Sequence, residues 1–329
     1  MLTDPFGRAI TYLRISLTDR CNMRCVYCMP ASGIHWSPIS DLLSDDHIVQ
    51  IVEEAVSLGV RKVRLTGGEP LARPGILALV RRIADIQGIQ DLSLTTNGLL
   101  LEDMAELLAS SGLRRVNISL DTLDKEKFTR ITRYGDFERV WRGILAAERA
   151  GLSPIKLNAV IVRGLNSDEL TSLARLTIDH PWHVRFIEIM PIGNAREWGH
   201  HFPAPDTRYF SVKEMHGALA AFNLQNIPSA TDNETARTFR IPGAPGTVGF
   251  ISPLGEHFCQ NCNRLRLTFD GRLRACLVSR AEVSLQEAAR NGEPLEKFFK
   301  QAVSDKPRQH DLLNPTPDGS QRGMNQIGG

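Results

Sequence analysis

The chain has 329 residues, which is long enough for one barrel-sized domain or two smaller ones. Its hydrophobic share of 42% and charged share of 23% are ordinary for a globular protein, and its net charge of +2 argues against general nucleic-acid binding, which needs a strongly basic face. No apolar stretch approaches the ~18 residues of a membrane span, and the N-terminus lacks the basic and apolar segments of a secretory signal, so we expect no membrane contact and a cytoplasmic location.

Strand-like and helical segments alternate over residues 13–189. A helix over Ser44–Leu58 is expected, with Ser44 as its N-cap and Gly59 at its end. Six runs predict strands, namely Leu13–Thr18, Lys62–Thr66, Asp91–Thr95, Arg115–Leu120, Ile155–Val162 and His183–Ile189. Repeated βα units of this kind predict an α/β fold with a parallel sheet, here an incomplete TIM-type (β/α)6 barrel.

Three cysteines, Cys21, Cys25 and Cys28, lie on the loop that leaves the first predicted strand, and we call them the first triplet. Each thiolate can bind one iron of a cubane 4Fe-4S cluster, and the fourth iron then stays open for a small ligand because no fourth cysteine follows nearby. A zinc site completed by His35 is the alternative. The spacing Cys-x3-Cys-x2-Cys resembles the signature of the radical S-adenosylmethionine (SAM) superfamily, in which SAM chelates the open iron.

The second predicted strand ends in a Thr-Gly-Gly-Glu-Pro sequence that contains Gly67 and Gly68. Paired glycines allow a tight turn or the close approach of a ligand to the backbone, and the position resembles the superfamily motif that binds the SAM amino group. On the fifth strand Lys156 alternates with Ile155 and Leu157. We expect Lys156 to project into the barrel mouth, where a lysine needs an anionic partner, although an exposed strand lysine is the alternative.

A second triplet, Cys259, Cys262 and Cys276, follows a less regular region that includes a predicted helix over Val212–Phe222. Apolar residues alternate on both sides of an Asp-Gly turn at residues 270–271, which predicts a hairpin that brings Cys276 back beside the other two. A zinc site completed by His257 is again the alternative. All six cysteines belong to the two triplets, and in a reducing compartment such grouping favours metal over disulfide.

Arginines at 264, 266, 272 and 274 surround the second triplet. They suit a polyanionic ligand and stabilise thiolates, or they form a solvated basic hairpin. From residue 304 onward the composition is rich in Pro, Gly, Asn and Ser, so we expect a segment that buries little and is mobile.

Taken together these motifs resemble one family, the GTP 3′,8-cyclases of molybdenum cofactor biosynthesis, from Phe6-Gly7-Arg8 to the final Gly328-Gly329. The resemblance implies a radical SAM partial barrel over residues 1–230, a region over 231–303 with a second cluster, and a flexible tail over 304–329 whose double glycine reaches into the active site.

The resemblance also implies roles for individual residues. Two 4Fe-4S clusters would be bound by Cys21, Cys25 and Cys28 and by Cys259, Cys262 and Cys276. SAM contacts would be Tyr27, Gly68, Ser119 and Met190. GTP contacts would be Arg14, Arg64, Thr95, Lys156, Arg264, Leu265 and Arg266. The first triplet with Arg264 and Arg266 would be catalytic.

The family reaction converts GTP into (8S)-3′,8-cyclo-7,8-dihydroguanosine 5′-triphosphate. Cleavage of SAM gives a 5′-deoxyadenosyl radical that removes hydrogen from C3′ of GTP, and the C3′ radical attacks C8 of guanine. The resemblance further implies flavodoxin or ferredoxin as electron donor, transfer of the product to cyclic pyranopterin monophosphate synthase, and a homodimer.

Two other classes remain open from the residues. A radical SAM enzyme that matures peptides would cleave SAM without GTP. A non-enzymatic module with two structural zinc sites would be colourless, whereas an iron-sulfur protein purified without oxygen is brown.

Overall fold

A computed structural model describes residues 1–192, 198, 202–228, 233–256, 258–310, 312 and 322–327. Its strands are β1 Tyr12–Ser16, β2 Lys62–Thr66, β3 Asp91–Thr96, β4 Arg115–Ser119, β5 Lys156–Ile161, β6 His183–Glu188, β7 Gln225–Ile227, β8 Arg237–Arg240, β9 Thr247–Ile251, β10 Arg264–Leu267, β11 Arg272–Arg274 and β12 Val283–Ser284. Its α-helices are α1 Asp45–Ser57, α2 Ile76–Ala84, α3 Leu101–Ser110, α4 Lys125–Thr132, α5 Phe137–Arg149, α6 Leu170–Asp179, α7 Val212–Ala218, α8 Leu285–Arg290, α9 Glu296–Ser304 and α10 Met324–Ile327.

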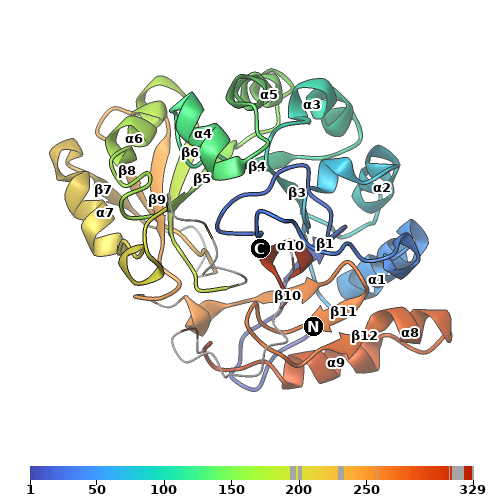
Figure 1. Ribbon diagram of the computed structural model, residues 1–329. Helices are drawn as coiled ribbons and strands as arrows, with labels where there is room; N and C mark the ends of the chain where they lie inside the picture. Colours follow the sequence, from blue (N-terminus) through green and yellow to red (C-terminus); the bar gives the residue numbers. More distant parts are fainter. Residues whose placement is uncertain are drawn as a thin grey trace.

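All of these strands join one sheet in the order β12-β11-β10-β1-β2-β3-β4-β5-β6-β9-β8-β7. The eight central strands, from β10 to β9, are mutually parallel, and antiparallel strands continue the sheet at both ends. The sheet curves into an open arc with α1–α6 on its outer side (Figure 1). The predicted incomplete barrel is therefore confirmed.

The six predicted strands agree with β1–β6 to within one or two residues at each end. Ser44 caps α1 as expected, because its side chain accepts a hydrogen bond from His47 N. The helix predicted over Val212–Phe222 is shorter, since α7 ends at Ala218 and a 3-10 turn follows over Ala220–Phe222. The predicted hairpin is confirmed by the antiparallel pairing of β10 with β11.

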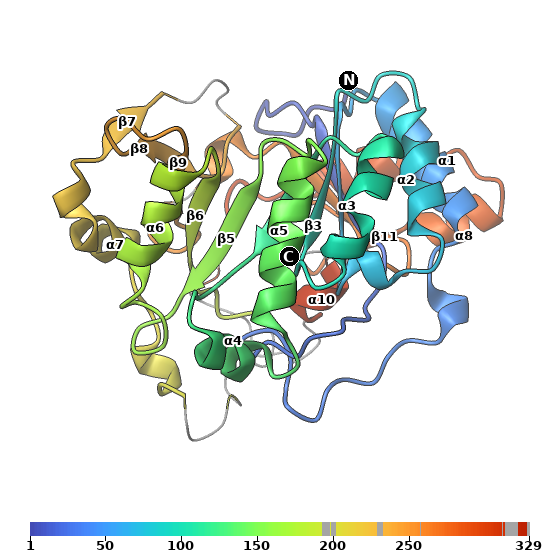
Figure 2. The same ribbon diagram turned by 90° about the horizontal axis from the view of Figure 1, so that it is seen from above.

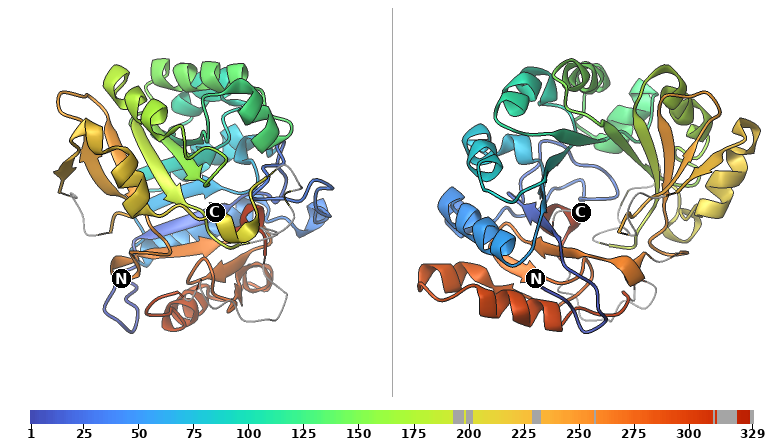
Figure 3. Two further views of the ribbon diagram at one scale, coloured as in Figure 1. Left: turned by 60° about the vertical axis from the view of Figure 1, so that its left-hand side comes forward. Right: turned by 180° about the vertical axis from the view of Figure 1, so that it is seen from behind.

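The core lies between the outer face of the sheet and the helices that cover it (Figure 3). On β1, Leu13 and Ile15 are fully buried, and on α1 the same is true of Ile51 and Val52. Burying one such side chain contributes about 1.5–3 kcal/mol, so this layer stabilises the βα units and leaves the inner face free for other residues. In the part of the chain that the structure describes, no helix is long and apolar enough to cross a membrane.

Segments from the C-terminal third complete both ends of the parallel sheet. β9 pairs with β6, and β10 pairs with β1. The short helix α10 lies on the inner side of the arc, away from the outer helices (Figures 1 and 2). The chain thus returns to the barrel twice after residue 230, and its last described residues enter it.

Candidate active site

The inner face of the curved sheet carries charged side chains. On β1, Leu13 and Ile15 pack into the core, so Tyr12 and Arg14 take the other face. The same alternation and the strand registers place on that face Arg14, Arg64, Arg115, Lys156, Arg185, Arg264 and Arg266. Closed TIM barrels fill their interior with branched apolar side chains. This barrel instead carries cations there, which suits a polar or charged ligand.

Neighbouring cations stand side by side across the strands. Arg14 is in register with Arg64 on β2 and with Arg266 on β10. The Arg185 guanidinium donates to Asn117 Oδ1 at 2.6 Å. The strand register therefore brings three predicted GTP contacts, Arg14, Arg64 and Arg266, together on one surface.

The electrostatics of this surface favour an anion. Burial, and then the positive charge of neighbouring arginines, lowers the pKa of Lys156 to about 7, that of Arg185 to about 9 and that of Arg266 to about 10. The Asp91 carboxylate on β3 forms an ion pair with Arg115. A ligand with several negative charges would offset the mutual repulsion of the remaining cations.

The loop that carries the first triplet is held by its backbone. Cys28 N donates to Cys25 O at 2.9 Å, which forms a tight turn between the two cysteines. The Arg133 guanidinium, at the end of α4, donates to the carbonyl oxygens of Arg24 and Met29, both at 2.9 Å. The position of the three thiols is therefore fixed by protein contacts at the carboxyl edge of the barrel.

The thiols of the first triplet lie within electrostatic reach of one another. Burial raises the pKa of Cys21 to about 11, that of Cys28 to about 12 and that of Cys25 well above its usual range. For Cys25 and Cys28 the next contribution is the negative charge of Cys21. Three such thiolates need positive charge among them, which a metal cluster supplies, so the donor set fits a 4Fe-4S cluster with three protein ligands.

The zinc alternative at the first triplet receives no support from the side-chain geometry of the described residues. Among the described residues, no three His, Cys, Asp or Glu side chains converge closely enough to hold a single metal ion. His35 is one of these residues, whereas His257 lies outside the described part of the chain, so the zinc alternative at the second triplet stays open.

The glycine pair at the end of β2 packs against the loop of the first triplet. Gly68 N donates to Thr18 O at 2.7 Å, and a Cβ on Gly68 would lie only 2.1 Å from Arg20 O. Gly67 has a φ of 143°, which disfavours other residues. These glycines are therefore required by the close approach of two backbones, whatever they bind in addition.

The other predicted SAM contacts lie along the same edge. Tyr27 donates its hydroxyl hydrogen to Asp121 Oδ2 at 2.5 Å. Ser119 ends β4, and Met190 lies two residues after β6. Thr95 of the GTP set is the penultimate residue of β3, and its hydroxyl is buried. All of these residues stand at the carboxyl ends of parallel strands, where TIM-type barrels place their active sites.

The hairpin brings the second triplet together. Arg266 pairs with Arg274, so the chain after β11 returns Cys276 toward Cys262, which precedes β10. Lys306 ties the two sides together, because its buried ammonium donates to Arg264 O at 2.8 Å and to Ala275 O at 2.6 Å.

Positive charge also acts directly on the thiols of the second triplet. Lys306 Nζ lies 3.6 Å from Cys262 Sγ. Although burial opposes ionisation, Lys306 and then Arg264 lower the pKa of Cys262 below its usual value. The nearby positive charge thus favours the thiolate form in the second triplet. Like the first triplet, it suits a 4Fe-4S cluster with three protein ligands and one open iron.

The C-terminal segment reaches from the second triplet toward the first. Arg266 Nη1 donates to Ile327 O at 3.4 Å, and Asn325 Nδ2 donates to Asp19 O at 2.9 Å. Asn325 and Ile327 are buried, so the expectation from composition that this region buries little is wrong for residues 322–327. Gly328 and Gly329 lie outside the described residues.

Several residues of the site were not predicted from the sequence. Arg115 and Arg185 alternate with apolar residues in their strands just as Lys156 does, and that signal could have found them. Asp121, which accepts from Tyr27, and Lys306 carried no comparable local signal.

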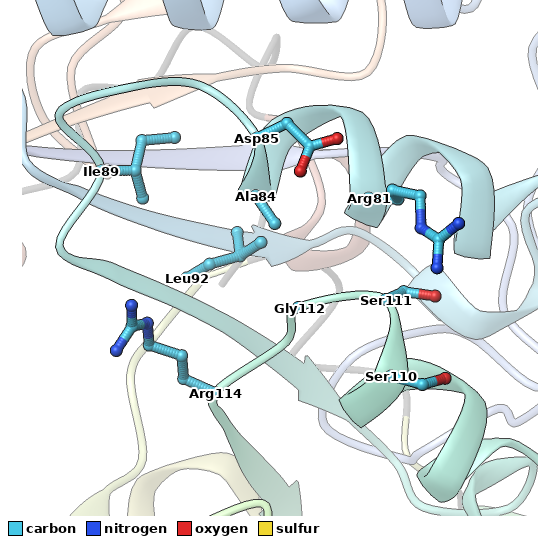
Figure 4. A pocket seen from close by; sticks show the side chains of 9 residues that line it. All are labelled: Arg81, Ala84, Asp85, Ile89, Leu92, Ser110, Ser111, Gly112 and Arg114. Carbon is cyan, nitrogen blue, oxygen red and sulfur yellow. The ribbon is translucent and has the colours of Figure 1, made fainter.

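A separate cavity of about 510 Å³ lies far from the cysteines, between the carboxyl ends of α2 and α3 (Figure 4). Arg81 and Arg114 line it from different elements. The hydroxyls of Ser110 and Ser111 both donate to Leu107 O, so they only close the end of α3. We assign this cavity no catalytic group.

Comparison with known proteins agrees with these features. Residues 15–177 match the family model of the radical SAM superfamily, and residues 182–312 match that of Molybdenum Cofactor Synthesis C. Among solved structures, Streptococcus suis SuiB bound to S-adenosylmethionine aligns with a TM-score of 0.62 at 14% identity and covers 93% of this chain and 67% of that chain. That likeness shows the fold.

Curated relatives match over their whole length. The GTP 3′,8-cyclase of Moorella thermoacetica is 46% identical over 332 residues, and that of Alkaliphilus oremlandii is 45% identical over 330 residues, with 100% of this chain and of each relative covered. The chain therefore belongs to the GTP 3′,8-cyclase family within the radical SAM superfamily.

Proposed function

We propose that this protein converts GTP into (8S)-3′,8-cyclo-7,8-dihydroguanosine 5′-triphosphate, the first step of molybdenum cofactor biosynthesis. Full-length similarity to the cyclases supports this function. In the structure, the main support for this function is the cationic inner face of the barrel. Its strands β1 and β10 pair with each other; the first triplet follows β1, and the second triplet flanks the hairpin of β10 and β11. A polyanionic nucleotide on this face would lie between the two.

The first triplet would hold a 4Fe-4S cluster, and Tyr27, Gly68, Ser119 and Met190 would contact SAM beside it. With SAM bound, the cluster would supply one electron, and SAM would supply methionine and the 5′-deoxyadenosyl radical. The protein's own task is to fix the geometry: the bonds from Arg133 and the close contact at Gly68 hold the cysteine loop against the barrel before any ligand binds.

The cations of the inner face would hold the triphosphate. Guanidinium groups bind phosphate oxygens in pairs, so Arg14, Arg64 and Arg266, which are adjacent across three strands, would fix the nucleotide and thereby C3′. Thr95, Lys156 and Arg264 complete the proposed set, and Leu265, whose side chain packs into the core, would contact GTP through its backbone. The second triplet would hold a second 4Fe-4S cluster that binds guanine at its open iron.

We also propose the division of the chain into a barrel over residues 1–230, a second cluster region over 231–303 and a tail over 304–329. A flavodoxin or ferredoxin donor, transfer of the product to cyclic pyranopterin monophosphate synthase and a homodimer complete the proposal.

Reconstitution with iron and sulfide without oxygen, followed by incubation with SAM, dithionite and GTP, tests this function. Analysis for 5′-deoxyadenosine and a cyclised nucleotide should find both. Cys25→Ser should abolish SAM cleavage, whereas Cys262→Ser should retain some cleavage without cyclised product. SAM cleavage by the wild-type enzyme that is independent of GTP would favour another radical SAM activity, and cyclisation at the wild-type rate by Cys262→Ser would make the second triplet structural.

A further inference from the structure

Asn97 follows β3 and lies beside Cys21 of the first triplet, and three hydrogen bonds fix its position. Its backbone N–H donates to Glu69 Oε2 at 2.8 Å. Its side-chain Oδ1 accepts from Leu99 N at 3.0 Å, and its Nδ2 donates to Asn22 Oδ1 at 2.7 Å. Because the N–H of Leu99 can only donate, the oxygen of the Asn97 amide must face Leu99 and its NH2 group must face the cysteine loop.

In this orientation Asn97 Nδ2 lies 3.7 Å from Cys21 Sγ. The NH2 group has two hydrogens, so it can donate to Asn22 and to the sulfur at once. This contact places a donor hydrogen against the sulfur atom that would carry the negative charge of a cluster ligand. Asn97 therefore stabilises negative charge on one ligand of the first triplet.

The support of Asn97 is itself buried and rigid. Glu69 is fully buried, and its Oε1 accepts from Thr96 Oγ1 at 2.8 Å and from Leu71 N at 3.0 Å. Glu69 belongs to the glycine-rich turn after β2, so one carboxylate joins that turn to the end of β3. The Asn97 amide then extends this connection to the cysteine loop.

We propose that Asn97 is a positioning residue that raises the reduction potential of the cluster on the first triplet through its hydrogen bond to Cys21 Sγ. The inference rests on the proposed function, because it presupposes a 4Fe-4S cluster at this triplet. Hydrogen bonds to ligand sulfurs are one of the factors that set such potentials, and a donor stabilises the reduced cluster most because reduction adds negative charge. Glu69 and Leu99 hold the donor in place.

The test is a redox titration of the reconstituted full-length protein, without SAM or GTP, for the wild type and for Asn97→Leu, which is similar in size and uncharged but has no donor. A Cys25→Ser protein, which lacks the first cluster, supplies the signal of the second cluster for subtraction. At the potential where the wild-type cluster is half reduced, the ratio of reduced to oxidised cluster should fall at least about threefold in Asn97→Leu.

Two further variants separate the donor from the loop. Asn97→Asp keeps an oxygen for Leu99 N and loses the donor, and it should lower the ratio further because it adds a negative charge. Asn22→Ala removes the neighbouring acceptor but keeps the donor, and it should change the ratio less than twofold. An unchanged ratio in both Asn97 variants at wild-type iron content overturns the inference, and so does loss of iron in both, which would make Asn97 a structural residue of the loop.

The outcome is independent of the cyclisation assay. If the wild type bound iron and showed a shifted ratio in Asn97→Leu but made no cyclised nucleotide, the inference would stand and the proposed function would fail. If the wild type cyclised GTP but the ratio was unchanged in Asn97→Leu, the proposed function would stand and the inference would fail.

Discussion

Lys156 is a half-buried lysine whose charge is opposed by several arginines, and we expect this arrangement to make ligand binding depend on pH. The pKa of its ammonium is lowered to about 7, first by burial and then by Arg185. A triphosphate beside it would raise that pKa. Below pH 7 Lys156 is protonated with or without GTP, whereas above pH 7 binding must take up a proton, so affinity should fall as pH rises.

Calorimetry at pH 8 in two buffers of different ionisation enthalpy measures this uptake. We expect GTP binding to take up a proton in the wild type but not in Lys156→Ala, which should also bind GTP at least about tenfold more weakly and SAM almost as well as the wild type. Lys125→Ala, at an exposed lysine of α4, is the control. Binding without proton uptake by the wild type would remove Lys156 from the triphosphate site.

Gly68 is a residue whose role in the structure can be tested without substrate. Because a Cβ would lie 2.1 Å from Arg20 O, Gly68→Ala must displace the cysteine loop and should cost about 1–3 kcal/mol of the free energy of unfolding. Thermal unfolding and the iron content after reconstitution measure the effect, which should be a lower melting temperature and less bound iron. Gly217→Ala, where a Cβ meets nothing within 4 Å, is the control. Normal stability and iron content of Gly68→Ala would show that the loop yields at no cost.

At the scale of elements, a charged side chain, Arg322, anchors the chain just before α10. Arg322 donates to both carboxylate oxygens of Asp270 and of Glu282, at 2.8–3.0 Å. Both carboxylates belong to the hairpin region, and all three side chains are at least three-quarters buried, so these bonds should be stronger than those of an exposed pair. A helix of four residues cannot form alone, so α10 depends on such contacts, and we expect those of Arg322 to be the strongest.

We therefore expect Arg322→Ala to release the C-terminal segment. Hydrogen exchange of residues 322–327 should become at least about tenfold faster, while the exchange of β1–β6 is unchanged. Lys297→Ala, on α9, removes an exposed ion pair with Glu293 and should change neither exchange rate. If protection of the segment survived in Arg322→Ala, apolar contacts such as those of Ile327 would be its main support.

The elements differ in how far local sequence determines them. β1–β6 and α1 were predicted because alternation, caps and glycines are local signals. The positions of β9 and β10 beside β6 and β1 were not predicted, because parallel pairing depends on contacts between segments far apart in the chain. For the same reason the local pattern identified Lys156 as an inward cation but could not show that Arg266 and Arg14 are neighbours.

On the scale of the whole molecule, the C-terminal third closes around the barrel that the first two thirds build. Arg8 makes this closure firm, since its guanidinium donates to Cys259 O at 2.6 Å and to Pro307 O at 2.7 Å and pairs with Asp4. The N-terminus, the second triplet and the start of the tail are thus joined.

Gly328 and Gly329 follow α10 in the sequence and lie outside the described residues, whereas α10 itself lies on the inner side of the arc. Deleting Gly328 and Gly329 should leave the fold and GTP binding intact and reduce cyclisation severely, because two residues without side chains can enter a narrow space and offer backbone amides and a carboxylate to the arginines. A peptide ending Met-Asn-Gln-Ile-Gly-Gly should restore part of the activity. Full turnover by the truncated protein without peptide would show that the end of the tail is dispensable.

In the proposed reaction the barrel holds GTP so that its C3′ hydrogen faces the 5′-deoxyadenosyl radical. Incubation of the reconstituted enzyme with SAM, dithionite and GTP that carries deuterium at C3′, followed by mass spectrometry, tests it directly. Deuterium should appear in 5′-deoxyadenosine, and the cyclised nucleotide should have lost it. Formation of 5′-deoxyadenosine without deuterium, or of a cyclised nucleotide that retains it, would contradict the claim.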